Sequence, residues 1–367
     1  MIIAEMLESD GPGGAELVEL RLAQALRDRG HTIVPVGPSM GCGWLAGQFR
    51  EQGFDPQTFT LRRPLDWQCL RGMIDVLRRH RVDLVHSHEF TMAVYGTAAA
   101  RWLGIPHIIT MHGSQYVTSK WRRQVLLRWA FKTSAATVVV SRDTKRHLEK
   151  ELGLSETALR VILNGVPVRS GSRSAVRTEL GVADDQLMLL AVGSLVPRKG
   201  HAVLIEALST IGSGKWVLAV AGGGAEKERL EALAASKGLT AQVKILGHRE
   251  DIPDLLAATD VFVMPSLWEG LPLALLEAML AGKAVIASRT SGIPEAVNDG
   301  VDGLLTPPGD VAELAKALRR VIEDPARRAQ LGAAARARAM AEFTLDAMAD
   351  GYERVFREVS GRSNGRP

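Results

Sequence analysis

The chain has 367 residues, 46% hydrophobic and 23% charged, as is ordinary for a soluble globular protein of two domains. Two cysteines form no disulfide framework, no apolar run reaches the roughly 18 residues of a membrane-spanning helix, and no basic signal segment opens the chain. The net charge of +4 fits an anionic ligand or membrane surface and gives no reason to expect nucleic acid. We expect a cytoplasmic protein, free or peripheral at the inner face of the membrane.

Apolar strands alternate with amphipathic helices in the first half of the chain, residues 1–168. This alternation is typical of βαβ units with a parallel sheet. The expected elements in chain order are strand 2–7, helix 15–29, strand 32–36, helix 67–80, strand 84–86, helix 91–103 and strands 108–111, 136–140 and 161–163.

A polar stretch rich in Ser, Arg and Gly, residues 169–177, reads as a linker to a second domain, 169–342. That domain repeats the scheme, and we expect a final helix, about 343–359, to pack back on the first domain. Two doubly wound domains then face a cleft, and such sheets bind ligands at the carboxyl ends of their strands. The expected elements are strands 187–192, 216–221, 243–246, 261–264 and 284–287, and helices 202–210, 227–237, 253–258, 273–280, 311–322 and 327–338.

The stretch 265–277 joins one of these strands to a helix. Gly270 allows a close backbone approach, and Pro272 suits a helix start, so the N–H groups that follow can bind a phosphate. Glu269 and Glu277 flank this anion site, which favours a ligand with hydroxyls beside phosphates, such as a nucleotide sugar. The alternative is an ordinary strand-to-helix turn with two solvated glutamates.

Two glycine-rich turns follow other strands of the second domain. Residues 193–200 fail the P-loop template, but Arg198 and Lys199 remain at the carboxyl end of a strand and suit a diphosphate. A solvated basic turn is the alternative. Residues 222–224 fail the dinucleotide fingerprint because Lys227 stands at its third glycine position. They indicate a tight turn close to a ligand or to the neighbouring loop.

In the first domain, Gly13 and Gly14 precede a helix and can receive a phosphate or a sugar hydroxyl. His86, His88 and His112 lie at strand ends, where a zinc site is conceivable, but no cysteine or patterned carboxylate completes it. We prefer a reading in which His112 hydrogen-bonds a substrate and one of the other two histidines supports the sheet edge.

Three further patterns bear on the class of activity. No Asp-x-Asp pair occurs, so we expect no metal and no cofactor beyond the co-substrate. The Gly-x-Ser-x-Gly pattern at 37–41 runs into Cys42-Gly43, which predicts a loop and not the helix of a hydrolase elbow. Residues 120–132 hold five basic residues and two tryptophans, a composition that suits an anionic membrane, although a partly buried surface helix is the alternative.

With these motifs collected, the chain resembles the retaining glycosyltransferases of family 4, also described as glycosyl transferases group 1, which have the GT-B fold. The resemblance runs from Gly13 to about Asp324. It is most specific in the two glutamates of 269–277, in 192–200, and in the blocks 291–295 and 299–305. It is looser at 13–16, 86–88, 110–113 and 164–166.

The resemblance implies a first domain that binds the acceptor, a second that binds the donor, and a role for each matching residue. Glu277 resembles the ribose ligand, Glu269 the residue facing the donor sugar, and His112 the histidine near its reacting face. Arg198 and Lys199 resemble the diphosphate clamp. The implied donor-binding set is Ser194, Gly223, Gly270, Leu271, Pro272, Leu273 and Glu277, and the acceptor or phosphate side is Gly13, Gly14 and His88.

The chain departs from the family pattern at Ser194, where many members carry Arg, and at Pro167, where many have Asp. The implied activity is retaining transfer from a nucleotide diphosphate sugar, UDP- or GDP-linked, to a glycan, lipid-linked or small-molecule acceptor, as in glycan, glycolipid or polysaccharide biosynthesis. Two other functions remain open: a nucleotide-sugar 2-epimerase of the same architecture, and a non-catalytic nucleotide-sugar binder.

Overall fold

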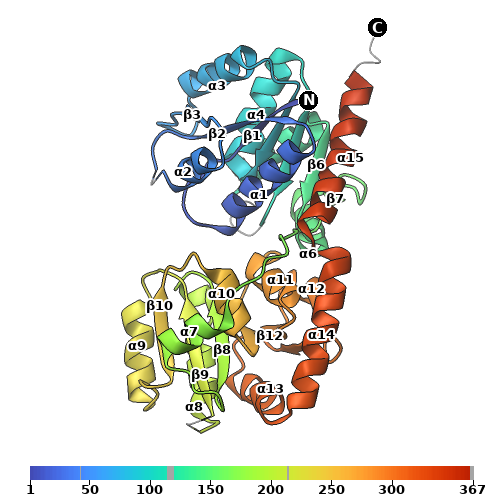
Figure 1. Cartoon of the computed structure of the whole chain (residues 1–367). Coiled ribbons are helices and arrows are strands. Elements are labelled where there is room, and N and C mark those ends of the chain that lie inside the picture. Colours follow the sequence, from blue (N-terminus) through green and yellow to red (C-terminus); the bar gives the residue numbers. More distant parts are fainter. Residues whose placement is uncertain (42, 114–119, 213–214, 364–367) are drawn as a thin grey trace. The chain divides into compact units, whose positions relative to one another are not determined.

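The computed structural model describes residues 1–41, 43–113, 120–212 and 215–363. The chain divides into two compact units, the first formed by Met1–Gly165 with the segment from Leu345 onward, and the second by Val166–Thr344 (Figure 1). The boundaries expected from the sequence were 168 and 342.

The first unit is built on a parallel sheet. Among the described residues it has seven strands in the order β3-β2-β1-β4-β5-β6-β7. The central strand β4 is buried along its whole length, as expected for a parallel sheet covered on both faces. The strands are β1 (Ile2–Met6), β2 (Thr32–Pro38), β3 (Gln57–Phe59), β4 (Leu84–His88), β5 (His107–Met111), β6 (Ala136–Val139) and β7 (Arg160–Val161).

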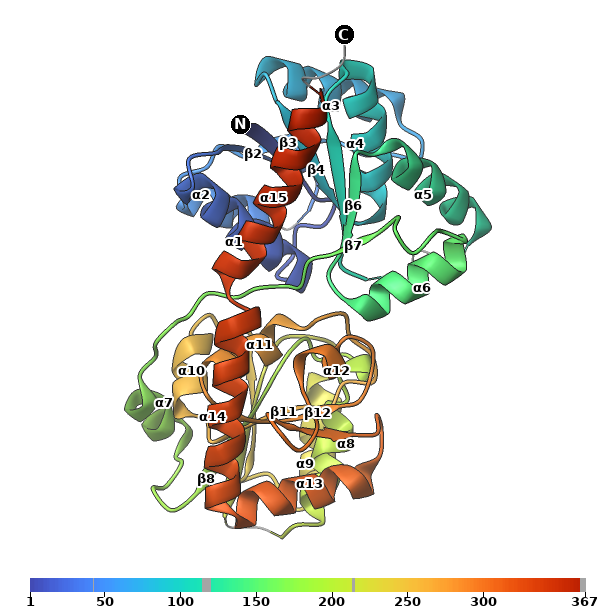
Figure 2. The same cartoon turned by 90° about the vertical axis from the view of Figure 1, so that its right-hand side faces the viewer.

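Helices cover both faces of this sheet. The last helix of the chain lies along α1 (Figures 1 and 2), so the expected return of residues 343–359 to the first unit is observed. Arg29, the C-cap of α1, pairs with Asp350 at 2.6 Å, and His31 pairs with Glu353 at 3.1 Å. The helices are α1 (Gly14–Asp28), α2 (Trp44–Glu51), α3 (Trp67–Arg79), α4 (Glu89–Leu103), α5 (Trp121–Thr133), α6 (Arg142–Leu152) and α15 (Leu345–Ser363).

The second unit repeats the architecture. Its described residues form a parallel sheet of six strands in the order β10-β9-β8-β11-β12-β13. The strands β8 and β11 are neighbours, so the loops that follow them leave the same edge of the sheet. The strands are β8 (Leu187–Val192), β9 (Trp216–Ala221), β10 (Val243–Gly247), β11 (Val261–Met264), β12 (Ala284–Ser288) and β13 (Leu304–Thr306).

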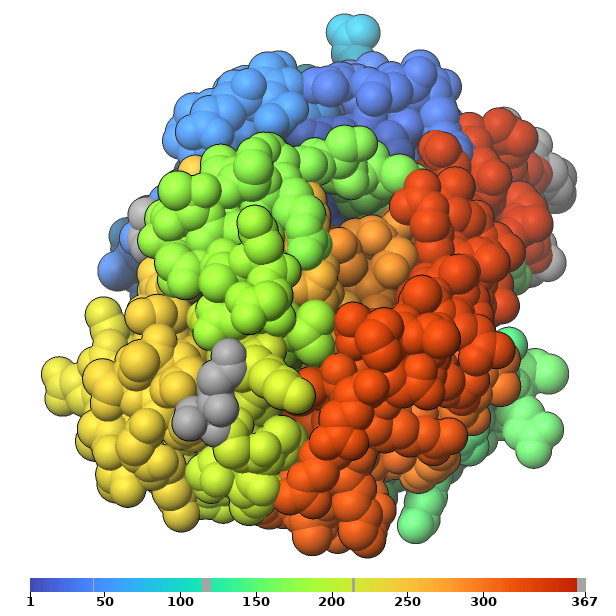
Figure 3. All heavy atoms as spheres, turned by 60° about the horizontal axis from the view of Figure 1, so that its bottom comes forward, coloured from blue at the N-terminus to red at the C-terminus, as the bar shows by residue number. Residues whose placement is uncertain are grey.

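Two helices of the second unit begin at aspartates that cap them. Asp310 accepts two backbone N–H bonds at the start of α13, and Asp324 caps α14. Figure 3 shows α13 and α14, orange to red, side by side on one face. The helices are α7 (Arg173–Leu180), a 3₁₀ turn η1 (Pro197–Lys199), α8 (His201–Ser209), α9 (Lys227–Ser236), α10 (Ile252–Ala258), α11 (Leu273–Leu280), α12 (Ile293–Ala296), α13 (Val311–Glu323) and α14 (Pro325–Glu342).

The expected linker at 169–177 is wrong over its second part, because α7 begins at Arg173. Arg173 and Arg177 both bind Asp260, at 2.9 and 3.1 Å, and Arg177 also donates to the carbonyls of Ala183 and Gln186. These charge-assisted bonds fold a stretch that has few apolar residues. Polar composition alone therefore gave a linker that was too long.

The Gly-x-Ser-x-Gly pattern forms no nucleophile elbow. Ser39 follows β2, its hydroxyl contacts that of Thr60 at 2.7 Å, and the next helix begins only at Trp44. Cys42, which the pattern argument also used, lies outside the described residues. Within the described ranges, no helix is both long and apolar enough to cross a membrane.

Candidate active site

The glycine-rich turns of the second unit pack directly on one another. The turn after β9 lies against the turn after β8: Leu195 donates to the carbonyl of Gly223 at 2.8 Å, and a Cβ on Gly222 would overlap the carbonyl oxygen of Gly193. Of the two roles expected for residues 222–224, the tight turn against the neighbouring loop is the one observed. Gly223 has open space at its Cβ position. Its donor-binding role stays a prediction.

A buried carboxylate holds both cations of the turn after β8. Glu269, 6% exposed, pairs with the Lys199 ammonium and lies 3.7 Å from the Arg198 guanidinium. Ser266 donates to the same carboxylate at 2.9 Å. The Arg198 side chain is 42% exposed and lies 5.9 Å from the Trp268 ring, whereas Lys199 is 13% exposed. The sequence placed these residues at one sheet edge but did not predict their pairing.

Helix α11 begins beside this ion pair at the bounds expected from the sequence. Its N-cap is Pro272, which has an extended conformation and makes no side-chain capping hydrogen bond. The side chains of Leu271 and Leu273 are buried, so these residues can offer a ligand only their backbone. Glu277 lies partly exposed within the helix, and Ser194 is exposed in the turn after β8. Anions are favoured at such a helix start.

One buried histidine belongs to this loop and was not singled out by the sequence. His201 is the first residue of α8, directly after the Lys199-Gly200 turn. Burial, with a smaller contribution from the charge of Lys199, lowers the pKa of His201 to about 4. Its ring is therefore neutral at neutral pH. A histidine that opens a helix is common, and nothing in the sequence distinguished this one.

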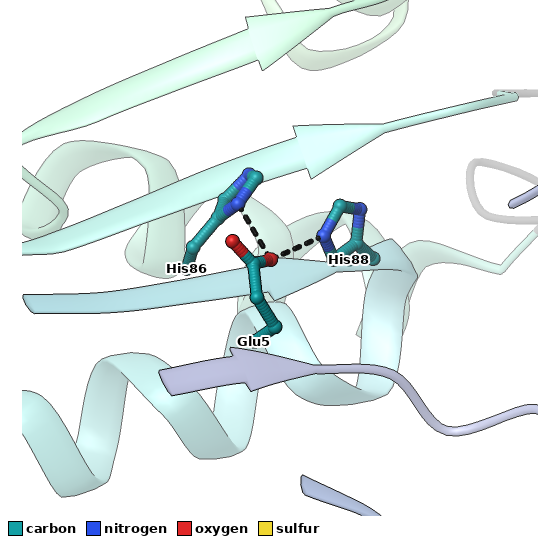
Figure 4. A group of neighbouring side chains, drawn as sticks. All are labelled: Glu5, His86 and His88. Carbon is teal, nitrogen blue, oxygen red and sulfur yellow. Dashed lines mark hydrogen bonds and ion pairs between the residues drawn. The ribbon is translucent and has the colours of Figure 1, made fainter. Parts of the chain in front are cut away.

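In the first unit, Glu5, His86 and His88 lie together inside the sheet (Figure 4), and their hydrogen bonds continue to His112. Glu5 of β1 accepts from His88 at 3.0 Å, and the other ring nitrogen of His88 lies 2.8 Å from Nε2 of His112. His86 lies 2.8 Å from the same Glu5 oxygen and bonds Thr110 at 2.8 Å. The sequence placed the three histidines together but missed Glu5, whose signal was a carboxylate inside an apolar strand.

Burial keeps these imidazoles neutral. The pKa values of His86, His88 and His112 are lowered to about 3, with burial as the main cause in each. The pKa of Glu5 is raised by burial, against which its bond to His88 acts. Neutral rings can orient a ligand through one N–H and one lone pair each.

A zinc site at His86, His88 and His112 was conceivable from the sequence, but the described cluster of possible metal ligands includes only two of these histidines, together with Glu5. His112 hydrogen-bonds His88, and the described cluster whose donor atoms lie within 4.8 Å of one another is Glu5, His86 and His88. All three are fully buried in the sheet and in direct contact. Glu5 contacts both histidines, His86 also bonds Thr110, and His88 also bonds His112.

The Glu16 carboxylate lies at Gly13, in the expected phosphate or acceptor position, and its charge also acts on Glu89. Gly13 caps α1, and a Cβ there would overlap the Glu16 carboxylate. Glu89 bonds the backbone N–H of His112 at 3.0 Å, and its pKa is raised to about 7, first by burial and further by Glu8 and Glu16. This charge disfavours a phosphate at Gly13 and leaves the sugar or acceptor hydroxyl as the better of the two expected ligands.

Glu89 also has an unusual backbone, with φ of +65°. That conformation is strained for a residue with a side chain and often marks a functional site. Neither this strain nor the bond to His112 has a sequence signal.

Helix α5 matches the predicted helix at 120–132 and is mostly exposed. Trp121, Val125 and Trp129 are spaced four residues apart and are 69%, 54% and 38% exposed, and among α5 residues only Leu127 and Ala130 are buried. An exposed apolar stripe with exposed basic residues around it is compatible with membrane contact. It fits the alternative of a partly buried helix less well.

Taken together, the sheets and loops define a class. Two parallel α/β units, one of them presenting paired cations, a buried carboxylate and a helix start at its carboxyl edge, are typical of enzymes that bind nucleotide-linked substrates.

The family follows from the comparisons. The model of glycosyl transferases group 1 matches residues 172–338, and that of glycosyltransferase family 4 matches residues 12–170. UDP-Gal:alpha-D-GlcNAc-diphosphoundecaprenol alpha-1,3-galactosyltransferase of Escherichia coli is 31% identical over 276 residues, 71% of each chain. The chain belongs to the group 1 glycosyltransferases and is a glycosyltransferase.

Two further relatives extend this result. The alpha-maltose-1-phosphate synthase of Mycolicibacterium smegmatis is 29% identical over 310 residues, 76% of this chain and 79% of that protein. The crystal structure of Anabaena HepE in complex with UDP superimposes with a TM-score of 0.87 at 25% identity, covering 98% of this chain and 100% of HepE. The fold is GT-B, as the sequence predicted.

Proposed function

We propose that the chain transfers a sugar, with retention of anomeric configuration, from a nucleoside diphosphate sugar to an acceptor hydroxyl. The observation that carries this proposal is the group of Arg198, Lys199 and Glu269 beside the start of α11. Two cations and a helix start are suited to a leaving diphosphate, whose negative charge grows as the glycosidic bond breaks. UDP is the first donor base to test, because it is bound by HepE and named for the E. coli relative.

The transfer step needs no side-chain base. The acceptor oxygen forms a bond to the anomeric carbon on the face that the diphosphate leaves, and the anomeric carbon–phosphate oxygen bond breaks. The acceptor proton passes to an oxygen of the leaving diphosphate. Glu277 binds the ribose hydroxyls. Glu269 faces the donor sugar beside the two cations with which it pairs. His112 bonds a sugar hydroxyl near the reacting centre.

No metal is required in this proposal, because Arg198, Lys199 and α11 supply the positive charge that a divalent ion would give. Turnover should survive dialysis against EDTA. Loss of turnover with recovery on Mg²⁺ or Mn²⁺ would assign the diphosphate to a metal. Metal content measured after dialysis also shows whether the Glu5 cluster retains an ion.

The experiment that tests the function combines a donor screen with product analysis. UDP- and GDP-hexoses are screened by thermal shift, and the stabilising donor is incubated with lipid-linked, polysaccharide and small-molecule acceptors. We expect a new glycoside that depends on both substrates. An isomerised donor without acceptor would establish an epimerase, and stabilisation without any product would establish a binder.

We also propose that α5 contacts an anionic membrane from the cytoplasmic side. Its exposed Trp121 and Trp129 would enter the interface, and Lys120, Arg122 and Arg123 would attract acidic lipids. The full chain should sediment with anionic vesicles at low salt and be released at high salt.

A matched variant makes that test specific. Trp121→Ala should release the chain from vesicles, whereas Trp102→Ala, an equally exposed tryptophan on α4, should not. Equal sedimentation of both variants, or no sedimentation of the wild type, would end the membrane proposal.

A further inference from the structure

The hydrogen bonds of His88 constrain the position of the protons in its neighbours. His88 uses both ring nitrogens: Nε2 lies 3.0 Å from Oε2 of Glu5, and Nδ1 lies 2.8 Å from Nε2 of His112. The His88 and His112 rings are stacked, with 5.1 Å between centroids and 16° between planes. A neutral imidazole has one N–H donor and one lone-pair acceptor, so each bond in this chain fixes the direction of the next.

The carboxyl group of Glu5 sets that direction. Oε2 accepts the proton of His88 Nε2, which leaves Nδ1 of His88 as an acceptor, and Nε2 of His112 must then be the donor. Protonation of Glu5 does not reverse the chain, because Oε2 also lies 2.8 Å from His86 Nδ1, a buried nitrogen with no hydrogen-bond partner among the described residues. A proton on Oε2 can point to His86 while Oε2 still accepts from His88.

The far side of His86 agrees with this direction. Its Nε2 lies 2.8 Å from the Thr110 hydroxyl, which lies 3.1 Å from the hydroxyl of Tyr352 on α15. Both hydroxyls can accept as well as donate. His86 can therefore carry its proton on Nε2 and keep Nδ1 bare.

We propose that Glu5 is a positioning residue for His112: acting through His88, it fixes His112 as the Nε2–H tautomer and leaves Nδ1 as a lone-pair acceptor for a hydroxyl of the donor sugar. The second half of this inference rests on the proposed role of His112 in transfer. The first half concerns the protein alone. His112 is partly exposed, and Nδ1 has no hydrogen-bond partner among the described residues, so this nitrogen is available to a ligand.

The tautomer can be measured without any substrate. In the full chain labelled with ¹⁵N-histidine, long-range ¹H–¹⁵N correlation spectra at neutral pH distinguish protonated from bare ring nitrogens, and His112→Gln assigns the His112 signals. We expect protonated Nε2 and bare Nδ1. A wild-type spectrum with protonated Nδ1 would overturn the proposal outright.

Variants then test whether Glu5 fixes the tautomer of His112. Glu5→Leu removes the acceptor, so His112 should populate both tautomers. We expect turnover to fall roughly 10- to 100-fold, by analogy with the loss of a partner that orients a metal-bound histidine. Glu5→Gln keeps an acceptor oxygen and should stay within about threefold of wild type. Asp66→Asn, at a buried carboxyl that caps α3 in the same unit, is the matched control and should change neither the tautomer nor turnover.

The outcomes separate the two halves of the inference. If Glu5→Leu keeps a single His112 tautomer, Glu5 does not set it. If Glu5→Leu fails to fold, the wild-type spectrum and Glu5→Gln still decide the tautomer. If the tautomer is as expected but His112→Gln turns over like wild type, the role of His112 in transfer is wrong, and the proposed function must then place another group at the sugar.

Discussion

Replacing Lys199 by Met removes an ammonium group from the buried Glu269 carboxylate. Loss of one partner of a buried ion pair typically costs about 3–5 kcal/mol, because the other charge stays desolvated. Glu269 keeps the Ser266 hydroxyl at 2.9 Å and Arg198 at 3.7 Å, and Arg198 is partly solvated. We therefore expect a loss at or just below the low end of that range, about 2–3 kcal/mol of unfolding free energy.

A double-mutant cycle in urea isolates this pair. Glu269→Gln in the Lys199→Met background removes the unpaired charge and should recover most of the loss, with a coupling energy of about 2 kcal/mol. Lys283→Met is the matched control, because Lys283 is another half-buried lysine of the same unit and donates to the carbonyls of Ala257 and Thr259. It should destabilise the chain without coupling to Glu269→Gln.

Ligand binding separates the clamp from mere stability. Loss of a charge-assisted bond of about 1.5–3 kcal/mol should weaken UDP binding of Lys199→Met by roughly 10- to 100-fold, measured by calorimetry. Lys283→Met should bind UDP like wild type. Additive stabilities in the cycle, or unchanged UDP affinity in Lys199→Met, would refute the reasoning.

Three further changes have defined outcomes. Glu277→Ala should weaken nucleoside diphosphate binding by about tenfold in calorimetry, through loss of ribose bonds, and unchanged affinity removes that role. Gly200→Ala should destabilise the chain by about 1–3 kcal/mol in urea, because its Cβ would overlap the Pro265 carbonyl at φ of +67°; unchanged stability would contradict that close approach. Burial lowers the pKa of His107 to about 3. The contribution of the neutral, buried ring to folding stability is therefore complete above about pH 6.5, where the ring is also neutral in the unfolded chain. It is lost as the pH falls toward 3, because the unfolded chain takes up a proton that the folded chain does not. The stability difference between wild type and His107→Gln should shrink by about 1.4 kcal/mol per pH unit below pH 6, and a constant difference would contradict the pKa.

Patterned elements of the fold were predictable from the sequence. Apolar runs such as 187–192 and 261–264 mark strands, because a parallel sheet buries both faces of its strands. The start of α11 follows from Pro272, because proline is tolerated at the beginning of a helix but not in its interior. Helix α7 was missed, because its stability comes from Arg173 and Arg177 binding Asp260, and that contact spans more than 80 residues.

The candidate site was predictable in its membership and less so in its contacts. Strand ends gave Arg198, Lys199, Glu269 and His112, because parallel strands direct their carboxyl ends to one edge. The pairing of both cations with Glu269 depends on the distance between two loops, which residue spacing does not fix. The roles of these residues toward a ligand stay predictions.

Buried polar networks were the least accessible. Glu5 of β1 bonds His88 of β4 across 83 residues, and only the pairing of these two strands in the sheet brings the residues together. A carboxylate in an apolar strand indicates a buried polar contact, but the sequence does not show which residue it contacts.

Retention of configuration is tested most directly by the anomeric signal of the product. The donor that the screen identifies, an α-linked nucleoside diphosphate sugar, is incubated with its acceptor, and the configuration of the new linkage is read by proton NMR. We expect an α-linked product formed with release of the nucleoside diphosphate. A β-linked product would show inversion and would contradict the transfer on the diphosphate's own face, with the proton taken up by the leaving phosphate.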